Sequence, residues 1–169
     1  VRQRLLDGRI AAPVKGVAWY SKGLYNNGSH FIDLLQYWLG PVRQYILLKA
    51  GRKVGNDVEP DFRLVFEQGE VNFLAAREED FSHYTVELIG RNGRLRYDLG
   101  GEQVWWQAAI PSSVSPSYTV LDPCPQTLPG EIKRIQWHVA QQLARALAGM
   151  DNSLCTGREA LALIETIDS

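Results

Sequence analysis

The chain has 169 residues, a length that favours one domain with a core of its own. Apolar residues make up 45% and charged residues 22%, which excludes a wholly disordered chain. With a net charge of -1, the chain lacks the excess of Lys and Arg that is typical of nucleic-acid-binding proteins. No apolar run reaches the ~20 residues of a membrane span, no charged-then-apolar leader opens the chain, and its two cysteines fit a reducing compartment. We therefore expect a cytoplasmic protein without a nucleic-acid or membrane partner.

Charge is uneven along the chain. Residues 1–60 hold nine Lys or Arg and four Asp or Glu, a net of +5, so the remaining residues carry -6. Positive clefts concentrate anions, and this asymmetry is compatible with an anionic small ligand. A solvated surface accounts for the same residues, so both interpretations stay open.

The first predicted elements are a short helix, a strand and a longer helix. Residues 1–6 resemble the end of a helix that stops at Gly8, and the alternating residues 14–20 indicate a strand. Residues 28–39 predict an amphipathic helix that Gly40-Pro41 ends. Its apolar side chains recur at i, i+3, i+4 and i+7, namely Phe31, Leu34, Leu35 and Trp38. Its candidate N-cap oxygens are those of Asn26, Asn27 and Ser29.

From residue 42 to 109 the apolar residues alternate, which predicts antiparallel strands. The segments 62–66 and 71–75 indicate one hairpin, and the Asn92-Gly93 turn indicates a second. In a further strand over 104–109, Trp105 and Trp106 are expected on opposite faces. One face of this sheet should pack on a core. The free face still carries Val65, Leu74 and Ile89, enough to suspect a partner surface.

The last third alternates between loop and helix. Residues 110–129 hold five of the eight prolines and are expected to form a long loop. Residues 131–150 predict an amphipathic helix, and a last helix is expected after Thr156. The apolar stripe of the first of these helices comprises Ile132, Ile135, Val139, Leu143, Ala146 and Leu147. The other two histidines, His83 and His138, and the two cysteines belong to no recognisable metal-ligand cluster, so no metal site is expected.

Candidate catalytic side chains are densest between residues 22 and 33. His30 falls in the first turn of the predicted helix, where amide dipoles favour the neutral ring, which can accept a proton. Asp33 lies one turn further along the same face, and Asn26 four residues earlier. These are parts of a general acid/base site, but a capped helix with a packed histidine explains the same residues without chemistry, and spacing alone favours that explanation. Lys22 is either a ligand for an anionic substrate or a solvated loop lysine.

The stretch GLYNNGSHFIDLLQYWLG, residues 23–40, resembles the motif that opens the first helix of the C-terminal domain in the Gfo/Idh/MocA oxidoreductases. The two hairpins and the closing GREALALIETIDS are similar to that domain in order and spacing, so the resemblance covers nearly the whole chain. It implies an α+β fold with an open, largely antiparallel sheet. Helices would pack on one face of the sheet, and the other face would be available for homo-oligomerisation.

The resemblance also implies a function. Residues 1–169 would be the C-terminal substrate-binding and oligomerisation domain of an NAD(P)-dependent dehydrogenase acting on a sugar, polyol or nucleotide-sugar hydroxyl. His30 matches the catalytic histidine. Many members carry an aspartate where Asn26 stands, and the amide resembles members acting on nucleotide-linked sugars; it can orient a hydroxyl but cannot serve as a base. Lys22, Tyr25 and Asp33 are candidate substrate contacts.

Two family motifs are missing from these residues, the glycine-rich GxGxxG turn and the Glu-Lys-Pro motif. NAD or NADP would therefore bind an N-terminal Rossmann domain outside this chain, and the chain alone is not expected to turn over. An alternative from another class is a non-catalytic oligomerisation or ligand-binding module of the same fold.

Overall fold

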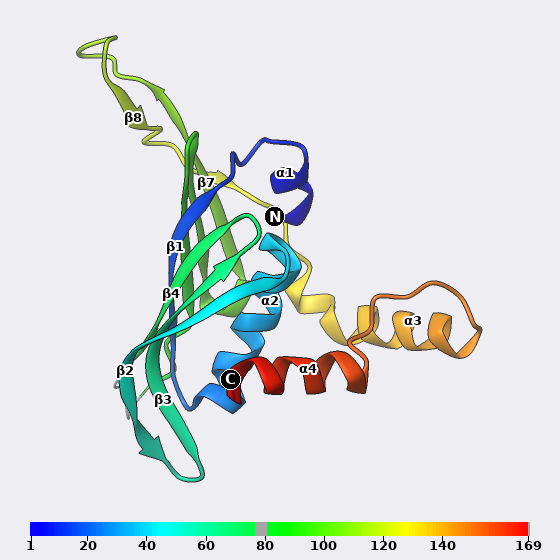
Figure 1. Ribbon diagram of the computed structural model, residues 1–169. Coiled ribbons are helices and arrows are strands. Elements are labelled where there is room, and N and C mark those ends of the chain that lie inside the picture. The colour runs from blue at the N-terminus through cyan, green and yellow to red at the C-terminus, as the bar shows by residue number, and fades with distance from the viewer. Residues whose placement is uncertain (77–80, 169) are drawn as a thin grey trace.

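The computed structural model describes residues 1–76 and 81–168 and contains one large sheet with helices on one side of it (Figure 1). The strands are β1 (Val14–Tyr20), β2 (Val42–Val54), β3 (Asp57–Phe66), β4 (Gly69–Ala75), β5 (Thr85–Gly90), β6 (Gly93–Asp98), β7 (Gln103–Pro111), β8 (Thr119–Leu121) and β9 (Gln126–Thr127). The α-helices are α1 (Arg2–Leu6), α2 (Ser29–Leu39), α3 (Ile135–Leu147) and α4 (Gly157–Asp168). The short segments η1 (Leu24–Gly28), η2 (Leu99–Gly101) and η3 (Ile132–Arg134) are a π-helical turn and two 3-10 turns.

The strands follow the order β2-β3-β4-β1-β5-β6-β7-β8, with β9 also beside β7. Strand β1 lies in the middle, parallel to β4 and antiparallel to β5, and the other described pairs are antiparallel. Gly16 permits this central position, since a Cβ there would lie 2.5 Å from the Leu88 side chain and 2.6 Å from the Glu87 carbonyl oxygen. The α+β fold with a mostly antiparallel open sheet is confirmed.

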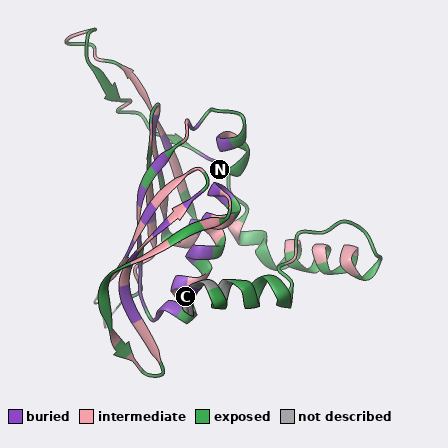
Figure 2. Cartoon of the chain, in the orientation of Figure 1, coloured by how far each residue is buried: buried purple, intermediate pink, exposed green. Residues whose placement is uncertain are grey.

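The core lies between the sheet and α2 (Figure 2). Helix α2 buries Phe31, Ile32, Leu35, Trp38 and Leu39. On the sheet, the Phe62 and Phe73 rings stack with centroids 4.5 Å apart. Each large apolar side chain that is fully buried contributes roughly 1.5–3 kcal/mol. This packing fixes α2, and therefore the side chains on its outer face, against the sheet.

Residues 110–129 are not simply a loop, and that prediction is wrong in part. Strand β7 runs to Pro111, and both β8 and β9 pair with it. The outer edge of β7 offers backbone groups that need partners. The segment supplies them while its prolines at 116, 123 and 125 fall between the paired residues. The result is a β-arm that extends beyond the rest of the sheet (Figure 1).

The predicted amphipathic helix at 131–150 exists as η3 followed by α3, but none of its residues is buried. Its stripe residues Ile135, Val139 and Leu143 are each about half exposed. The predicted helix is present, but the described part of the chain does not bury its apolar stripe. The reason is geometric, because α3 projects sideways from the sheet, beyond α2 (Figure 1).

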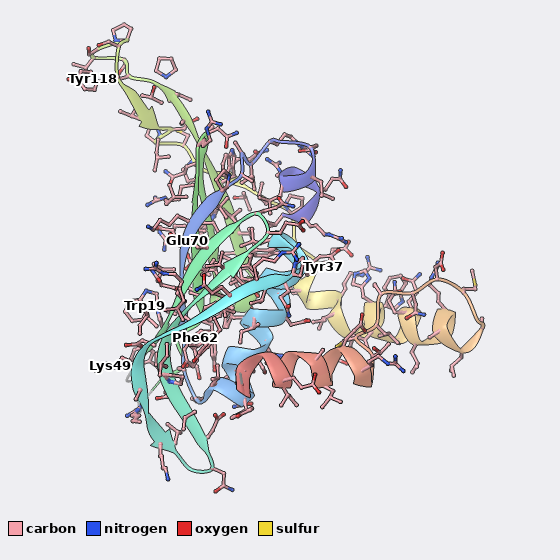
Figure 3. The ribbon with its side chains drawn as sticks, viewed as in Figure 1. Trp19, Tyr37, Lys49, Phe62, Glu70 and Tyr118 are labelled. Atoms are coloured by element: carbon pink, nitrogen blue, oxygen red, sulfur yellow. The ribbon has the colours of Figure 1, made fainter. Side chains whose placement is uncertain are left out.

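No described helix covers the sheet face opposite α2, which we call the uncovered face (Figure 1). Trp19 is 40% exposed on it, and Figure 3 shows Trp19 and Glu70 on the side of the sheet away from the helices. Trp106 is buried in the core while Trp105 lies on the other face beneath Arg96, so the expected split of the two indoles is confirmed. Among the described helices, none is long and apolar enough to cross a membrane.

Candidate functional site

The segment that leads to His30 is held by a neighbouring strand. The amides of Leu24 and Tyr25 donate to Asp57 Oδ1 at 3.1 and 3.2 Å, and the Asn26 amide donates to Asp57 Oδ2 at 3.1 Å. The carboxylate thus takes three of the donors that open a helical segment, where negative charge is favoured. The predicted side-chain N-cap of α2 is wrong, because the N-cap position is Gly28 and no side chain caps α2 there. The preceding segment η1 is capped instead by Asp57 at the start of β3, and nothing local in the sequence indicates this partner.

Gly23 makes this arrangement possible. Its φ of +97° is a conformation that favours glycine, and a Cβ would lie 2.0 Å from Asp57 Oδ2. The Gly23 amide also donates to the buried Glu59, whose other oxygen pairs with Arg52 at 2.8 Å. The start of the segment is therefore tied to β3 by two carboxylates.

Beside α2 the surface forms a groove of about 450 Å³, a size that suits a small ligand. His30 and Asp33 both line it, together with Asn27, Phe31, Leu34, Tyr37, Tyr84, Tyr97, Gly100, Ile132 and Ile135. Among the described residues, the His30 imidazole has no hydrogen bond or ion pair to a protein group. Its ring is exposed at the groove and available to a bound molecule.

Aromatic rings from three elements form much of the groove. Phe31 of α2 stacks on Tyr84, with ring centroids 6.1 Å apart, and meets Tyr97 of β6 edge-on at 6.2 Å. Burial raises the pKa of the Tyr97 phenol, so it stays protonated near neutral pH. Ile132 and Ile135 add an apolar wall. Apolar rings beside hydroxyl and imidazole groups suit a polyhydroxylated molecule, which presents both C–H and O–H groups.

Asn27 ties three elements together at one end of the groove. Its Nδ2 donates to the Ser21 carbonyl oxygen at 2.9 Å and to the Tyr84 hydroxyl at 3.0 Å. The fully buried Ser21 also accepts the His83 amide through its Oγ, at 3.2 Å. The residues that enter β5 are thereby fixed against the end of β1 and the start of the helical segment.

Three of the five predicted site residues do not line the groove, namely Lys22, Tyr25 and Asn26, which are exposed in the preceding turn. Lys22 has a φ of +63°, and its carbonyl oxygen accepts the Asn26 Nδ2 at 3.1 Å. In this structure the side-chain amide of Asn26 therefore stabilises the turn. No hydrogen bond joins Asp33 to His30 among the described residues, although both face the groove.

Sequence reasoning missed Asn27, Tyr84 and Tyr97 as groove residues. The sequence predicts Asn27 as a helix cap and places both tyrosines in the alternating strand region of residues 42–109. The available signal was that both tyrosines occupy otherwise apolar strand positions near strand ends, where a hydroxyl has to find a partner.

A second, larger hollow of about 900 Å³ lies near the other end of α2. It shares Asp33 and Tyr37 with the groove and also receives Arg2, whose guanidinium lies 4.7 Å from the centre of the Tyr37 ring. Several basic residues of the first third are paired with carboxylates, as Lys15 is with Glu70. No Lys or Arg of the described part of the chain lines the groove itself. The uneven charge of the chain therefore does not create a basic groove at His30.

Among residues 1–76 and 81–168, no site fits a metal or a dinucleotide. The described residues contain no group of three His, Cys, Asp or Glu side chains able to hold a metal ion. The turn between β1 and the following helical segment lacks the GxGxxG spacing, and its amides already bind Asp57. A diphosphate would have to displace this carboxylate. These residues therefore do not fit NAD or NADP.

No family model matches the chain, and no curated protein matches its sequence. Solved structures match its fold. UDP-N-acetylglucosamine 3-dehydrogenase GnnA from Acidithiobacillus ferrooxidans has a TM-score of 0.70 at 11% identity, over 97% of this chain and 55% of its own. The WlbA dehydrogenase from Bordetella pertussis, in complex with NADH and UDP-GlcNAcA, has a TM-score of 0.61 at 13% identity, over 99% and 54%.

Levoglucosan dehydrogenase in complex with NADH and L-sorbose matches at a TM-score of 0.67 and 12% identity, over 96% of this chain and 56% of its own. The chain thus spans about half the length of the solved chains it matches. All three neighbours are dehydrogenases, and two of them are solved in complex with NADH and a sugar or nucleotide-sugar ligand. At such identities, the likeness shows that this chain shares the fold of one half of such enzymes.

Proposed function

We propose that residues 1–169 form the substrate-binding domain of an NAD(P)-dependent oxidoreductase acting on a hydroxyl of a sugar, polyol or nucleotide sugar. The observation that carries the proposal is the groove at His30, an exposed imidazole among tyrosine rings on a fold shared with sugar dehydrogenases. NAD or NADP binds a dinucleotide-binding domain outside these residues, because this chain offers no fitting site for it.

His30 is the proposed acid/base. Its imidazole accepts the proton of the reacting hydroxyl and returns it in the opposite direction. The rings of Phe31, Tyr84 and Tyr97 hold the sugar, and Asp33 lies in reach of a further hydroxyl at the groove. A nucleotide-sugar substrate would extend its nucleotide over the turn that precedes the groove. Only such a substrate would contact Lys22, Tyr25 and Asn26.

The test uses the full-length protein that contains this chain. It is mixed with NAD or NADP and a panel of D-glucose, myo-inositol, L-sorbose and UDP-N-acetylglucosamine, and reduction of the nicotinamide is followed by absorbance. We expect turnover with at least one sugar. Binding of a panel member without turnover would instead favour a non-catalytic ligand-binding module, and no binding at all would refute the proposal.

We further propose that the uncovered sheet face contacts a second copy of the protein. Trp19 and Ile89 are 40% and 47% exposed there, among charged neighbours such as Lys15 and Glu87. Exposed apolar side chains on one continuous face favour a partner surface. Sedimentation should show an oligomer that the Trp19→Glu variant dissociates, and a monomeric wild type would contradict this part of the proposal.

A further inference from the structure

The Asn27–Tyr84 contact has only one possible direction. Asn27 Nδ2 lies 2.9 Å from the Ser21 carbonyl oxygen, which can only accept a hydrogen bond. The amide nitrogen, not the amide oxygen, therefore faces this end of the side chain, and the same nitrogen lies 3.0 Å from the Tyr84 hydroxyl. Because an amide nitrogen only donates, the Tyr84 oxygen is the acceptor.

With this direction, the hydroxyl hydrogen of Tyr84 is not used in the hydrogen bond to Asn27. A tyrosine hydroxyl has one proton to donate besides its accepting lone pairs, and Asn27 uses a lone pair. No described residue accepts that proton, and Tyr84 lines the groove together with His30. The ring cannot swing away freely, since it stacks on Phe31 and since Ser21 binds the neighbouring His83 amide.

We propose that Tyr84 is a specificity-determining residue whose phenol hydroxyl donates a hydrogen bond to an oxygen atom of the molecule bound in the groove. The inference rests on the proposed function and deepens it, because it selects a substrate with an accepting hydroxyl or carbonyl oxygen at that end of the groove. Asn27 is the positioning residue, because it fixes the Tyr84 oxygen as an acceptor and directs the proton elsewhere.

A site that donates to a substrate oxygen discriminates against an analogue that lacks it, because the donor is then left unpaired. The Tyr84→Phe variant of the full-length protein keeps the ring stacked on Phe31 and removes only the hydroxyl. We expect calorimetry to show that this variant binds roughly tenfold more weakly than the wild type. The ligand is whichever panel sugar binds the wild type, D-glucose, myo-inositol, L-sorbose or UDP-N-acetylglucosamine. Tyr118→Phe, an exposed tyrosine on the distant β-arm, is the matched control and should bind as the wild type does.

Monodeoxy analogues of the same sugar separate recognition from a loss of packing. One analogue should bind the wild type about tenfold more weakly than the parent sugar does, and Tyr84→Phe should bind that analogue and the parent alike. A second variant, Asn27→Asp, places a carboxylate beside Tyr84 that accepts a hydrogen bond from the phenol, and it also removes the donor to the Ser21 carbonyl oxygen. It should weaken binding at least as much as Tyr84→Phe does, and combining the two should cause no loss beyond that of Asn27→Asp alone.

The outcomes distinguish the two proposals. Equal affinity of wild type and Tyr84→Phe for a sugar that binds would overturn the role of Tyr84 and leave the proposed function in place. An equal loss for the parent sugar and every deoxy analogue would also overturn it, since that pattern signals damaged packing. Failure of all four panel sugars, namely D-glucose, myo-inositol, L-sorbose and UDP-N-acetylglucosamine, to bind the wild type would overturn the Tyr84 assignment together with its premise.

Discussion

Asp57 holds the turn that precedes His30, so removing its carboxylate should loosen that turn selectively. Three backbone amides, at residues 24, 25 and 26, donate to it at 3.1–3.2 Å, and the Val58 amide donates at 2.7 Å. Hydrogen bonds to a charged acceptor contribute roughly 1.5–3 kcal/mol each, but exposed amides regain water when they lose the acceptor. Two of the three turn residues are exposed, so we expect Asp57→Ala to cost about 2 kcal/mol, at the upper end of helix-cap substitutions.

Urea unfolding of the full-length protein measures this loss, and amide hydrogen exchange locates it. Exchange at residues 24–26 should accelerate, while exchange in the core strand β3 beyond residue 60 should follow only the global change in stability. Asp151→Ala is the control, since Asp151 is an exposed loop residue after α3. An unfolding free energy within about 0.5 kcal/mol of the wild type, with unchanged exchange at 24–26, would refute the capping role of Asp57.

Three further outcomes follow from single residues. Gly23→Ala should destabilise the same turn, by more than the ~1 kcal/mol expected of a positive φ alone, because its Cβ would clash with the capping carboxylate; urea unfolding checks this. Thr156 bonds hold the pKa of Glu159 below its ordinary value, so this stabilisation of α4 is present above that value and is lost as pH falls; circular dichroism should show Thr156→Ala weakening the helix at pH 7 more than in acid. Burial raises the pKa of Tyr97, so above the ordinary tyrosine pKa of ~10 the unfolded chain has lost a proton that the folded state keeps; the unfolding free energy should fall there as pH rises, less steeply in Tyr97→Phe.

Much of the fold is predictable from the sequence because its signals are local. The hairpin at Asn92-Gly93 and the helix ending at Gly40 follow from residue types with strong backbone preferences, and the structure has both. The prediction of a loop over residues 110–129 was wrong in part, because its proline content alone suggests a loop. Strands form there because the edge of β7 pairs with residues of this segment. The stripe on α3 correctly predicted an amphipathic helix but not what it faces, because periodicity does not identify a partner.

The candidate site was predictable only in part for the same reason. His30 and Asp33 lie one helical turn apart, so their common face follows from spacing, and both line the groove. Asn27 and Tyr84 are 57 residues apart in the chain, and only the sheet brings them together. Sequence spacing also placed Asn26 beside His30, whereas its amide turns back to the Lys22 carbonyl oxygen.

The most direct test of the central claim is the turnover of the His30→Ala variant of the full-length protein, with NAD or NADP and the panel sugar that the wild type uses. We expect a loss of ~10²-fold or more, with an unchanged unfolding midpoint, because the exposed imidazole supports no packing. His138→Ala, whose ring pairs with Glu131 outside the groove, should keep the wild-type rate. An unchanged rate in His30→Ala would contradict the assignment of the groove as the catalytic site.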